Sequence, residues 1–247
     1  MTADRPLDGQ AAVITGSARR NGRAMALALA ADGAAVVVNA RTARAEIEQV
    51  AREIEAAGGR ALAHQADITD EAQATGLVQA AVSRFGRIDI LINNVGVGNY
   101  KNLVDTSLDD YVEMMDTNVR TTFLFSRHTV PVMIKQGEGL VLIISSMAGV
   151  YGFPGEAVYC ATKFAQVGLA QGLDKELRPH GIKVGTICPG GTKTEFALGK
   201  GRTEASVEES HMLESEDVAA AILFACTQPK HSRIIQVQMR TMAEGLA

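Results

Sequence analysis

Cysteine and histidine are scarce in this chain of 247 residues, and they are scattered along it. The three cysteines, Cys160, Cys188 and Cys226, are odd in number and far apart, and no C-x-x-C motif occurs. With five dispersed histidines, this pattern argues against a disulfide framework and against a zinc site, and we predict no metal site. A reduced, cytoplasmic setting is expected.

The sequence also lacks a large excess of one charge and a long apolar run. Its formal net charge is −4 with both signs interspersed, which argues against a broad nucleic-acid-binding face. No apolar run reaches the ~18 residues of a membrane span. The stretch from Met1 to Gln10 is too polar for a secretory signal. No G-x-S-x-G elbow is present, which argues against a hydrolase. We expect a small-molecule partner and neither nucleic acid nor a membrane.

Short apolar runs alternate with helical patterns along the whole chain, and hydrophobic residues make up 47% of it. The runs predict strands near 10–14, 34–39, 60–65, 88–92, 140–144, 182–187 and 233–239. Helices are predicted near 23–32, 42–57, 70–85, 108–136, 155–180 and 216–227, with Pro131 expected to kink or end the longest. This order predicts an α/β fold, a doubly wound parallel sheet of about seven strands in one domain over 1–247. A (β/α)₈ barrel is the rival architecture, but the chain has too few strands for it.

Tyr159 and Lys163 form a candidate acid/base pair on the predicted helix 155–180. Residues four apart on a helix share one face. A free tyrosine has a pKa of about 10. A neighbouring ammonium favours the phenolate, so we expect Lys163 to lower the pKa of Tyr159. Many proteins carry a Tyr-x-x-x-Lys match by chance, so the pair needs support from the rest of the chain.

The turn after the first strand is a candidate phosphate-binding loop. Gly16 and Gly22 in this turn would let backbone N–H groups approach a pyrophosphate at a helix N-terminus, although they could simply punctuate strand and helix. The second strand ends at Asn39 and is followed by Arg41, with no acidic residue there. Together with Arg19 and Arg20, Arg41 favours a 2′-phosphate and therefore NADP(H); the alternative is that these are ordinary surface arginines.

Polar residues follow the later strands as well. Asp67, at the end of the third strand, could accept from an adenine amine or cap the next helix. Asn94 and Gly96 follow the fourth strand, and the rigid turn Pro189-Gly190 follows the strand at 182–187.

In this order the motifs resemble those of the short-chain dehydrogenase/reductase family over nearly the whole chain. The resemblance implies that Tyr159 donates the proton in carbonyl reduction and that Lys163 holds the nicotinamide ribose. It also implies that Ser146 binds the substrate oxygen and that Asn118 fixes a water linked to Lys163. Ser145 competes for the Ser146 role, but strand alternation sends the two side chains to opposite sides and the spacing to Tyr159 favours Ser146. The implied cofactor-binding residues are Gly16, Ser17, Arg19, Arg20, Asn21, Gly22, Asn39, Arg41, Asp67, Ile68, Asn94, Gly96, Tyr159, Lys163, Pro189, Gly190, Thr192 and Thr194.

The chain departs from the family pattern at a few positions. Most members have glycine at the position of Arg20 and an apolar residue at that of Asn21, whereas pteridine-reductase-like members also carry arginine there. Many members end in an Asp-Gly-Gly segment that this chain lacks. The resemblance implies a homodimer or homotetramer, and the final strand belongs to a subunit interface in many relatives.

The resemblance implies an NADP(H)-dependent carbonyl reductase or alcohol dehydrogenase. The alternatives are a pteridine or 3-oxoacyl-carrier reductase, for which Lys193, Lys200 and Arg202 are the available cations, and a non-catalytic cofactor sensor. Residues 191–213 are expected to form a substrate lid, with a plain surface loop as the alternative. The expected pocket residues are Val97, Met147, Tyr151, Phe153, Phe196, Leu198 and Met212.

Overall fold

A seven-stranded parallel sheet forms the centre of the protein. The computed structural model describes residues 5–208 and 211–243. The strand order is β3-β2-β1-β4-β5-β6-β7, and every neighbouring pair is parallel. The bounds are β1 Ala11–Ile14, β2 Ala35–Ala40, β3 Arg60–Gln65, β4 Ile90–Asn93, β5 Gly139–Ile144, β6 Ile182–Pro189 and β7 Gln236–Met239. The predicted doubly wound parallel sheet is confirmed.

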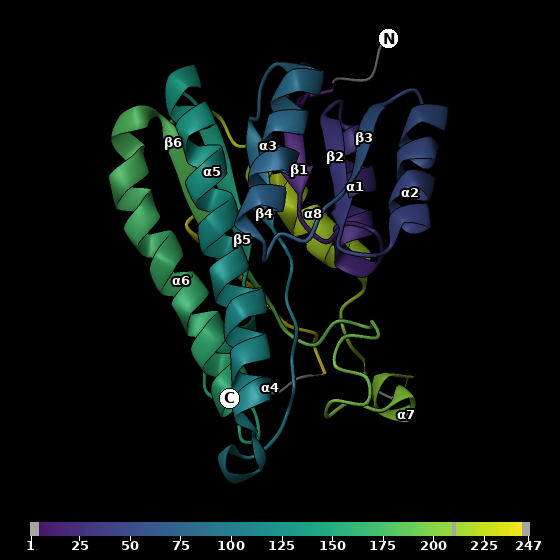
Figure 1. Cartoon of the computed structure of the whole chain (residues 1–247), viewed down its shortest axis with the longest axis vertical. Helices are drawn as coiled ribbons and strands as arrows, with labels where there is room; N and C mark the ends of the chain where they lie inside the picture. Colours follow the sequence, from purple (N-terminus) through teal and green to yellow (C-terminus); the bar gives the residue numbers. More distant parts are fainter. Residues whose placement is uncertain (1–4, 209–210, 244–247) are drawn as a thin grey trace.

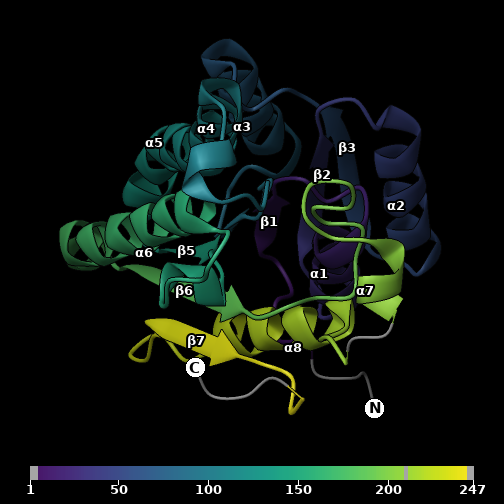
Figure 2. The same ribbon diagram turned by 90° about the horizontal axis from the view of Figure 1, so that it is seen from below.

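Helices cover both faces of the sheet, as Figures 1 and 2 show. One layer contains α1 Arg20–Ala31, α2 Arg44–Ala56 and α8 Ser215–Cys226. The other contains α3 Glu71–Phe85, α5 Thr121–Gln136 and α6 Ala157–Leu177. Two shorter helices, α4 Leu108–Met114 and α7 Glu204–Glu208, lie beyond the carboxyl ends of the strands.

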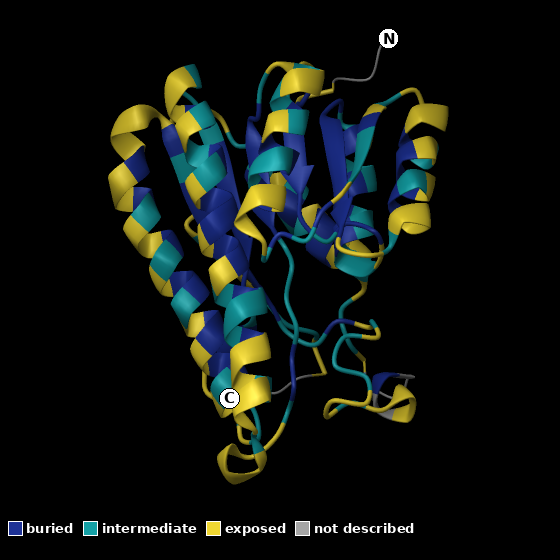
Figure 3. Ribbon diagram, in the orientation of Figure 1, coloured by how far each residue is buried: buried dark blue, intermediate teal, exposed yellow. Residues whose placement is uncertain are grey.

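Two apolar cores result, one on each face of the sheet. Val36 and Val38 belong to the core under α1, α2 and α8, whereas Val37 belongs to the core under α3, α5 and α6. Because consecutive strand residues point to opposite faces, a strand buried on both sides must be apolar at nearly every position. This explains the continuous apolar runs of the sequence, and Figure 3 shows the sheet as the buried centre of the molecule.

The long helical stretch at 108–136 is interrupted, but not at Pro131. The helix α5 continues through Pro131 to Gln136, so the expectation that proline ends it is wrong. Pro131 is exposed, and the helix tolerates the loss of one backbone hydrogen bond there. The irregularity lies upstream, where Met115–Arg120 is a π-helical segment between α4 and α5. Such segments occur frequently at functional sites.

The segment 191–213 follows β6 and passes the carboxyl ends of the strands. Residues 209 and 210 of this segment lie outside the described part. It is joined to the rest of the chain near Tyr100, whose N–H donates to the Lys200 carbonyl over 2.8 Å. Among the described helices, none combines the length and hydropathy needed to cross a membrane.

Candidate functional site

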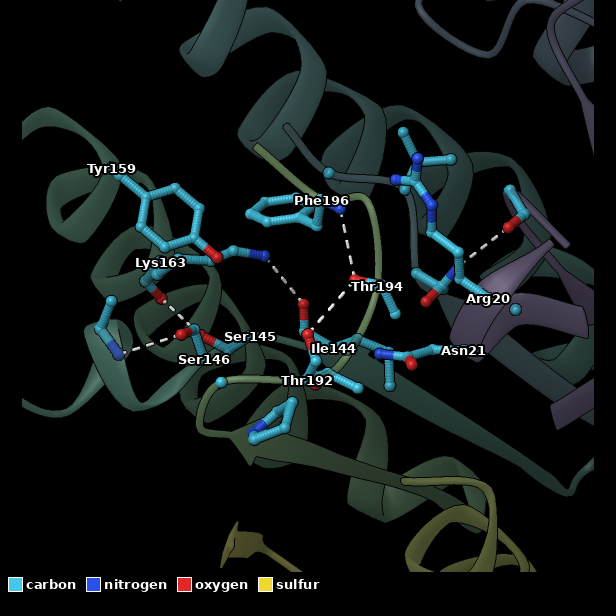
Figure 4. Close-up of a pocket in the computed structure, with 18 of the residues that line it drawn as sticks. Arg20, Asn21, Ile144, Ser145, Ser146, Tyr159, Lys163, Thr192, Thr194 and Phe196 are labelled. Atoms are coloured by element: carbon cyan, nitrogen blue, oxygen red, sulfur yellow. Dashed lines mark hydrogen bonds between the residues drawn. The ribbon is translucent and has the colours of Figure 1, made fainter. Parts of the chain in front are cut away.

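A cavity of about 530 Å³ opens at the carboxyl ends of β1, β4, β5 and β6. This is the topological switch point, because β4 and β2 flank β1 and their connections leave on opposite faces. Of the expected site residues, fifteen line this cavity: Gly16, Arg19, Arg20, Asn21, Gly22, Arg41, Asn94, Gly96, Ser146, Tyr159, Lys163, Pro189, Gly190, Thr192 and Thr194. Figure 4 shows Tyr159 and Lys163 on one side of it and Arg20 and Asn21 on the other.

The turn between β1 and α1 is held by hydrogen bonds to the end of β4. The side-chain amide of Asn94 donates to the carbonyls of Thr15 and Gly16 over 2.9 and 3.1 Å. Thr15 Oγ1 accepts from the backbone N–H groups of Asn94 and Val95. A Cβ atom on Gly22 would lie 2.8 Å from Ser17 Cα and 2.9 Å from Asn94 Nδ2, so only glycine fits. The turn is therefore a rigid glycine cradle at the start of α1, which suits a pyrophosphate.

Ser17 and Asn39 support this turn from beneath and do not line the cavity. Ser17 Oγ donates to the Ile14 carbonyl and accepts from the Asn39 N–H. Asn39 is fully buried, and its amide donates to the carbonyls of His64 and Ala66. Through these hydrogen bonds, Ser17 and Asn39 hold the turn between β1 and α1 in position.

Three arginines surround the loop, and they differ in their partners. Arg19 pairs with Glu46, and both side chains are exposed. Arg20 pairs with Glu195, which joins the loop to the segment 191–213, and its φ of 57° is left-handed. Arg41 is exposed and has no ion-pair partner in the described chain.

Asp67 and Ile68, at the end of β3, do not line the cavity. Asp67 Oδ1 accepts from the N–H and the hydroxyl of Thr69. The cap of α3 is instead Asp70, which accepts from the Gln73 N–H, so the idea that Asp67 caps this helix is wrong.

Tyr159 is buried in an aromatic cluster near the start of α6. Its ring lies 5.5 Å from that of Tyr100 and 5.9 Å from that of Phe196, centroid to centroid. Burial raises the pKa of Tyr159 well above its ordinary value, Tyr100 adds to this, and the hydrogen bond with Ser146 opposes it. The pKa of Tyr159 is therefore raised rather than lowered as expected, because desolvation of the phenolate is the largest influence on it. At neutral pH the phenol holds its proton.

Lys163 lies one turn further along α6, with its Nζ 5.7 Å from the centre of the Tyr159 ring. Its ammonium donates to the Ile144 carbonyl over 3.1 Å and to Gln166 Oε1 over 2.9 Å. Burial lowers the pKa of Lys163 to about 8. The Nζ atom also lies beside Gly96, 3.4 Å from where a Cβ would stand, so it faces the cavity.

Ser145 and Ser146, after β5, use their hydroxyls differently. Ser145 Oγ donates to the Lys163 carbonyl over 2.9 Å and so ties α6 to the sheet. Ser146 Oγ accepts from the Ala148 N–H and hydrogen-bonds Tyr159. The serine that hydrogen-bonds the phenol is therefore Ser146, whereas Ser145 bonds the Lys163 carbonyl; Figure 4 draws both serines.

Asn118 is fully buried in the π-helical segment and does not line the cavity. Its side-chain oxygen accepts from the Val97 N–H over 2.8 Å, and its amide donates to the Val97 carbonyl and to Thr162 Oγ1. Its backbone carbonyl accepts from Gln166 Nε2. Sequence reasoning missed Thr162 and Gln166, although both lie on the face of α6 that carries Tyr159 and Lys163.

The substrate end of the cavity is apolar with two charged side chains. Of the expected pocket residues, it is lined by Met147, Phe153, Phe196 and Met212, but not by Val97, Tyr151 or Leu198. Tyr100, Glu156 and Arg202 also line it. The guanidinium of Arg202 lies 5.8 Å from the Tyr100 ring centre. Burial raises the pKa of Glu156, and Arg202 opposes this rise. Lys200 is paired with Glu113.

Comparison with known proteins agrees with this geometry. The family model for short chain dehydrogenases matches residues 10–205. The chain belongs to the short-chain dehydrogenase/reductase family. Members of this family are oxidoreductases that use NAD(P)(H) and act on small molecules.

Individual relatives differ in what they act on. The chain is 34% identical over 225 residues to a 3-oxoacyl-[acyl-carrier-protein] reductase of Synechocystis, covering 90% of this chain and 91% of that protein. It is 35% identical to the glycine betaine reductase ATRR of Emericella nidulans, covering 98% of this chain but only 19% of that protein. A metagenomic short-chain oxidoreductase solved in complex with NADP superimposes with a TM-score of 0.83 at 30% identity, covering 97% of this chain and 100% of that one.

Proposed function

We propose that the protein is an NADPH-dependent reductase of carbonyl compounds, and that it oxidises the corresponding secondary alcohols in reverse. The observation that carries this proposal is the buried Tyr159 phenol, which keeps its proton and lies beside Ser146 at the cavity. A carbonyl that accepts a hydride develops negative charge on its oxygen, and two adjacent hydroxyls stabilise that charge.

The residues present fit the cofactor. The glycine cradle at Gly16 and Gly22 leaves backbone room for the pyrophosphate, and Lys163 faces the cavity beside Gly96 for the nicotinamide ribose. When bound, NADPH supplies the hydride. Ser146 orients the substrate oxygen, and Tyr159 delivers the proton to it as a general acid.

The test of this chemistry is a Tyr159→Phe variant. Removing the phenol should lower kcat for ketone reduction by about 10²- to 10⁴-fold. The control is Tyr111→Phe, an exposed tyrosine on α4, which should keep wild-type kcat. NADPH oxidation at 340 nm over a panel of ketones, pterins and 3-oxoacyl thioesters gives the rates. Undiminished turnover by Tyr159→Phe would refute the mechanism.

The preference for NADPH over NADH rests on the end of β2. The cavity is lined there by Ala40, Arg41, Thr42 and Ala43 and also by Arg19, and the carboxylate in contact with Arg19, Glu46, is not among the lining residues. An arginine–phosphate hydrogen bond contributes about 1.5–3 kcal/mol, which is roughly 10- to 100-fold in affinity. Arg41→Ala should therefore weaken NADPH by that factor and leave NADH unchanged. Equal losses for both cofactors would contradict the assignment.

A second candidate, reduction of 3-oxoacyl thioesters, is favoured by Arg202. This guanidinium lines the substrate end and has no ion-pair partner in the described residues, so it is available to a phosphate of a pantetheine arm. Acetoacetyl-coenzyme A and the uncharged acetoacetyl-N-acetylcysteamine separate the two functions. In Arg202→Met, a fall in kcat/KM confined to the coenzyme A ester supports this candidate. Equal kcat/KM for both esters in the wild type contradicts it.

A further inference from the structure

The Lys163 ammonium is held by two hydrogen bonds to neutral oxygen atoms of the protein. The side chain is buried, and its Nζ donates to the Ile144 carbonyl and to the Gln166 carboxamide oxygen. In the described part of the chain, Tyr159 on the same helix and Cys188 on β6 are the titratable groups that face it, and no described carboxylate pairs with it. Two neutral oxygens therefore provide the stabilisation that the buried cation needs.

Gln166 is oriented without ambiguity. Its side chain is fully buried, and its Nε2 donates to the Asn118 carbonyl over 2.8 Å and to Thr122 Oγ1 over 2.9 Å. Turning the carboxamide over would set its oxygen against the Asn118 carbonyl and its amide against the Lys163 ammonium. Both contacts would then be repulsive, so only one orientation satisfies the buried groups.

The far end of this chain of bonds lies in the π-helical segment. The Asn118 carbonyl accepts from Gln166 and also from the Thr122 hydroxyl, 2.8 Å away, so both of its lone pairs are occupied by side chains. The Asn118 side chain hydrogen-bonds Val97 and Thr162. A continuous connection thus runs from the Lys163 ammonium through the Gln166 carboxamide on α6 to the backbone carbonyl of Asn118 in the π-helical segment.

We propose that Gln166 is a positioning residue of the active site: its carboxamide fastens the Lys163 ammonium to the Asn118 carbonyl and keeps that lysine charged and aimed at the cavity. Gln166 thereby makes directly the link that the family resemblance assigns to a water on Asn118. The proposal has two consequences. The direction of the Nζ atom is fixed, and the acceptor oxygen offsets part of the burial that disfavours the ammonium.

The charge state of Lys163 can be measured without cofactor or substrate. The ¹³Cε resonance of Lys163, assigned by its loss in Lys163→Met, is followed by NMR as pH is raised on the cofactor-free protein. Gln166→Leu removes the acceptor and should move the Lys163 titration to lower pH by about one unit. Gln166→Glu replaces it with an anion and should move the titration to higher pH by a similar amount. Loss of ketone-reducing activity at alkaline pH should shift in the same two directions.

The matched control is Gln171→Glu, an exposed glutamine on the same helix, which should leave the Lys163 titration unchanged. If Gln166 serves only to pack α6 against the helix that carries Thr122, both Gln166 variants will unfold more easily while Lys163 titrates as in the wild type. That result overturns the proposal. If Gln166→Leu does not fold, Gln166→Glu decides alone, and a titration at or below the wild-type pH overturns the proposal. The role of Lys163 in hydride transfer rests on the function proposed above, but this titration does not, so the two can fail separately.

Discussion

Gly22, in the first turn of α1, tests whether the phosphate-binding loop depends on close backbone approach. Its φ is not left-handed, so a side chain there meets no backbone strain. The obstacle is space, because an added Cβ would overlap the Gly16 carbonyl oxygen and crowd Ser17 Cα and Asn94 Nδ2. Two of these three neighbours are backbone atoms, so the clash can be relieved only by moving the loop.

The two effects of Gly22→Ala oppose each other, and the clash should dominate. Overpacking typically costs about 1–3 kcal/mol. Replacing glycine with alanine in a helix raises the free energy of unfolding by about 0.5–1 kcal/mol. With close contact to backbone on two sides, we expect a net loss of about 2 kcal/mol, which lowers Tm by about 4–8 °C for a chain of this size. Displacement of the loop should also weaken NADPH binding.

Gly76, inside α3, is the matched control because a Cβ there would meet no atom within 4 Å. Gly76→Ala should therefore stabilise the protein by about 0.5–1 kcal/mol and leave NADPH affinity unchanged. Thermal unfolding and NADPH fluorescence titration measure both quantities on both variants. A Gly22→Ala protein that melts at or above the wild-type temperature and binds NADPH normally would refute the reasoning.

Two further substitutions test the buried interior, and a third, at an exposed position, is their control. Asp89→Asn should lower the free energy of unfolding by about 1–3 kcal/mol, because the buried carboxylate accepts from the Ala11 N–H and from Arg87. An unchanged midpoint of urea unfolding would contradict this. Phe125→Ala, in a fully buried position of α5, should cost about 3–5 kcal/mol. Phe224→Ala, at a position 56% exposed on α8, should change the free energy of unfolding by no more than about 0.5 kcal/mol in the same assay. Equal losses for Phe125→Ala and Phe224→Ala would contradict the assignment of Phe125 to the core.

The sheet was predictable because its signal is local. A strand buried on both faces, such as β2, must be apolar almost throughout, and a residue such as Gly33 or Gly86 marks where a helix ends. The position of Tyr159 opposite Ser146 was predictable through the order of motifs along the strands.

Other parts of the site depend on partners that are distant in sequence. Asn118 lies in the π-helical segment, and its side chain hydrogen-bonds Val97 and Thr162. No local sequence pattern predicts this π-helical segment. The sequence left two roles open for Asp67, an adenine contact and a helix cap, and it gave no sign that Thr69 hydrogen-bonds this carboxylate. The pKa of Tyr159 was predicted in the wrong direction because burial, the largest cause of the rise, cannot be read from the spacing of two residues.

The two walls of the cavity differ in how they are held, and this affects what mutation can change. The catalytic wall is α6, whose inner face is buried in the core. The opposite wall, 191–208 and 211–213, is fastened by peripheral ties such as Lys200–Glu113 and Arg20–Glu195. Amide exchange in that segment should proceed through local opening, whereas exchange in α6 should require far more of the protein to unfold. We therefore expect substitutions in the segment to change substrate preference with little loss of folding stability, whereas substitutions on the inner face of α6 should destabilise the fold.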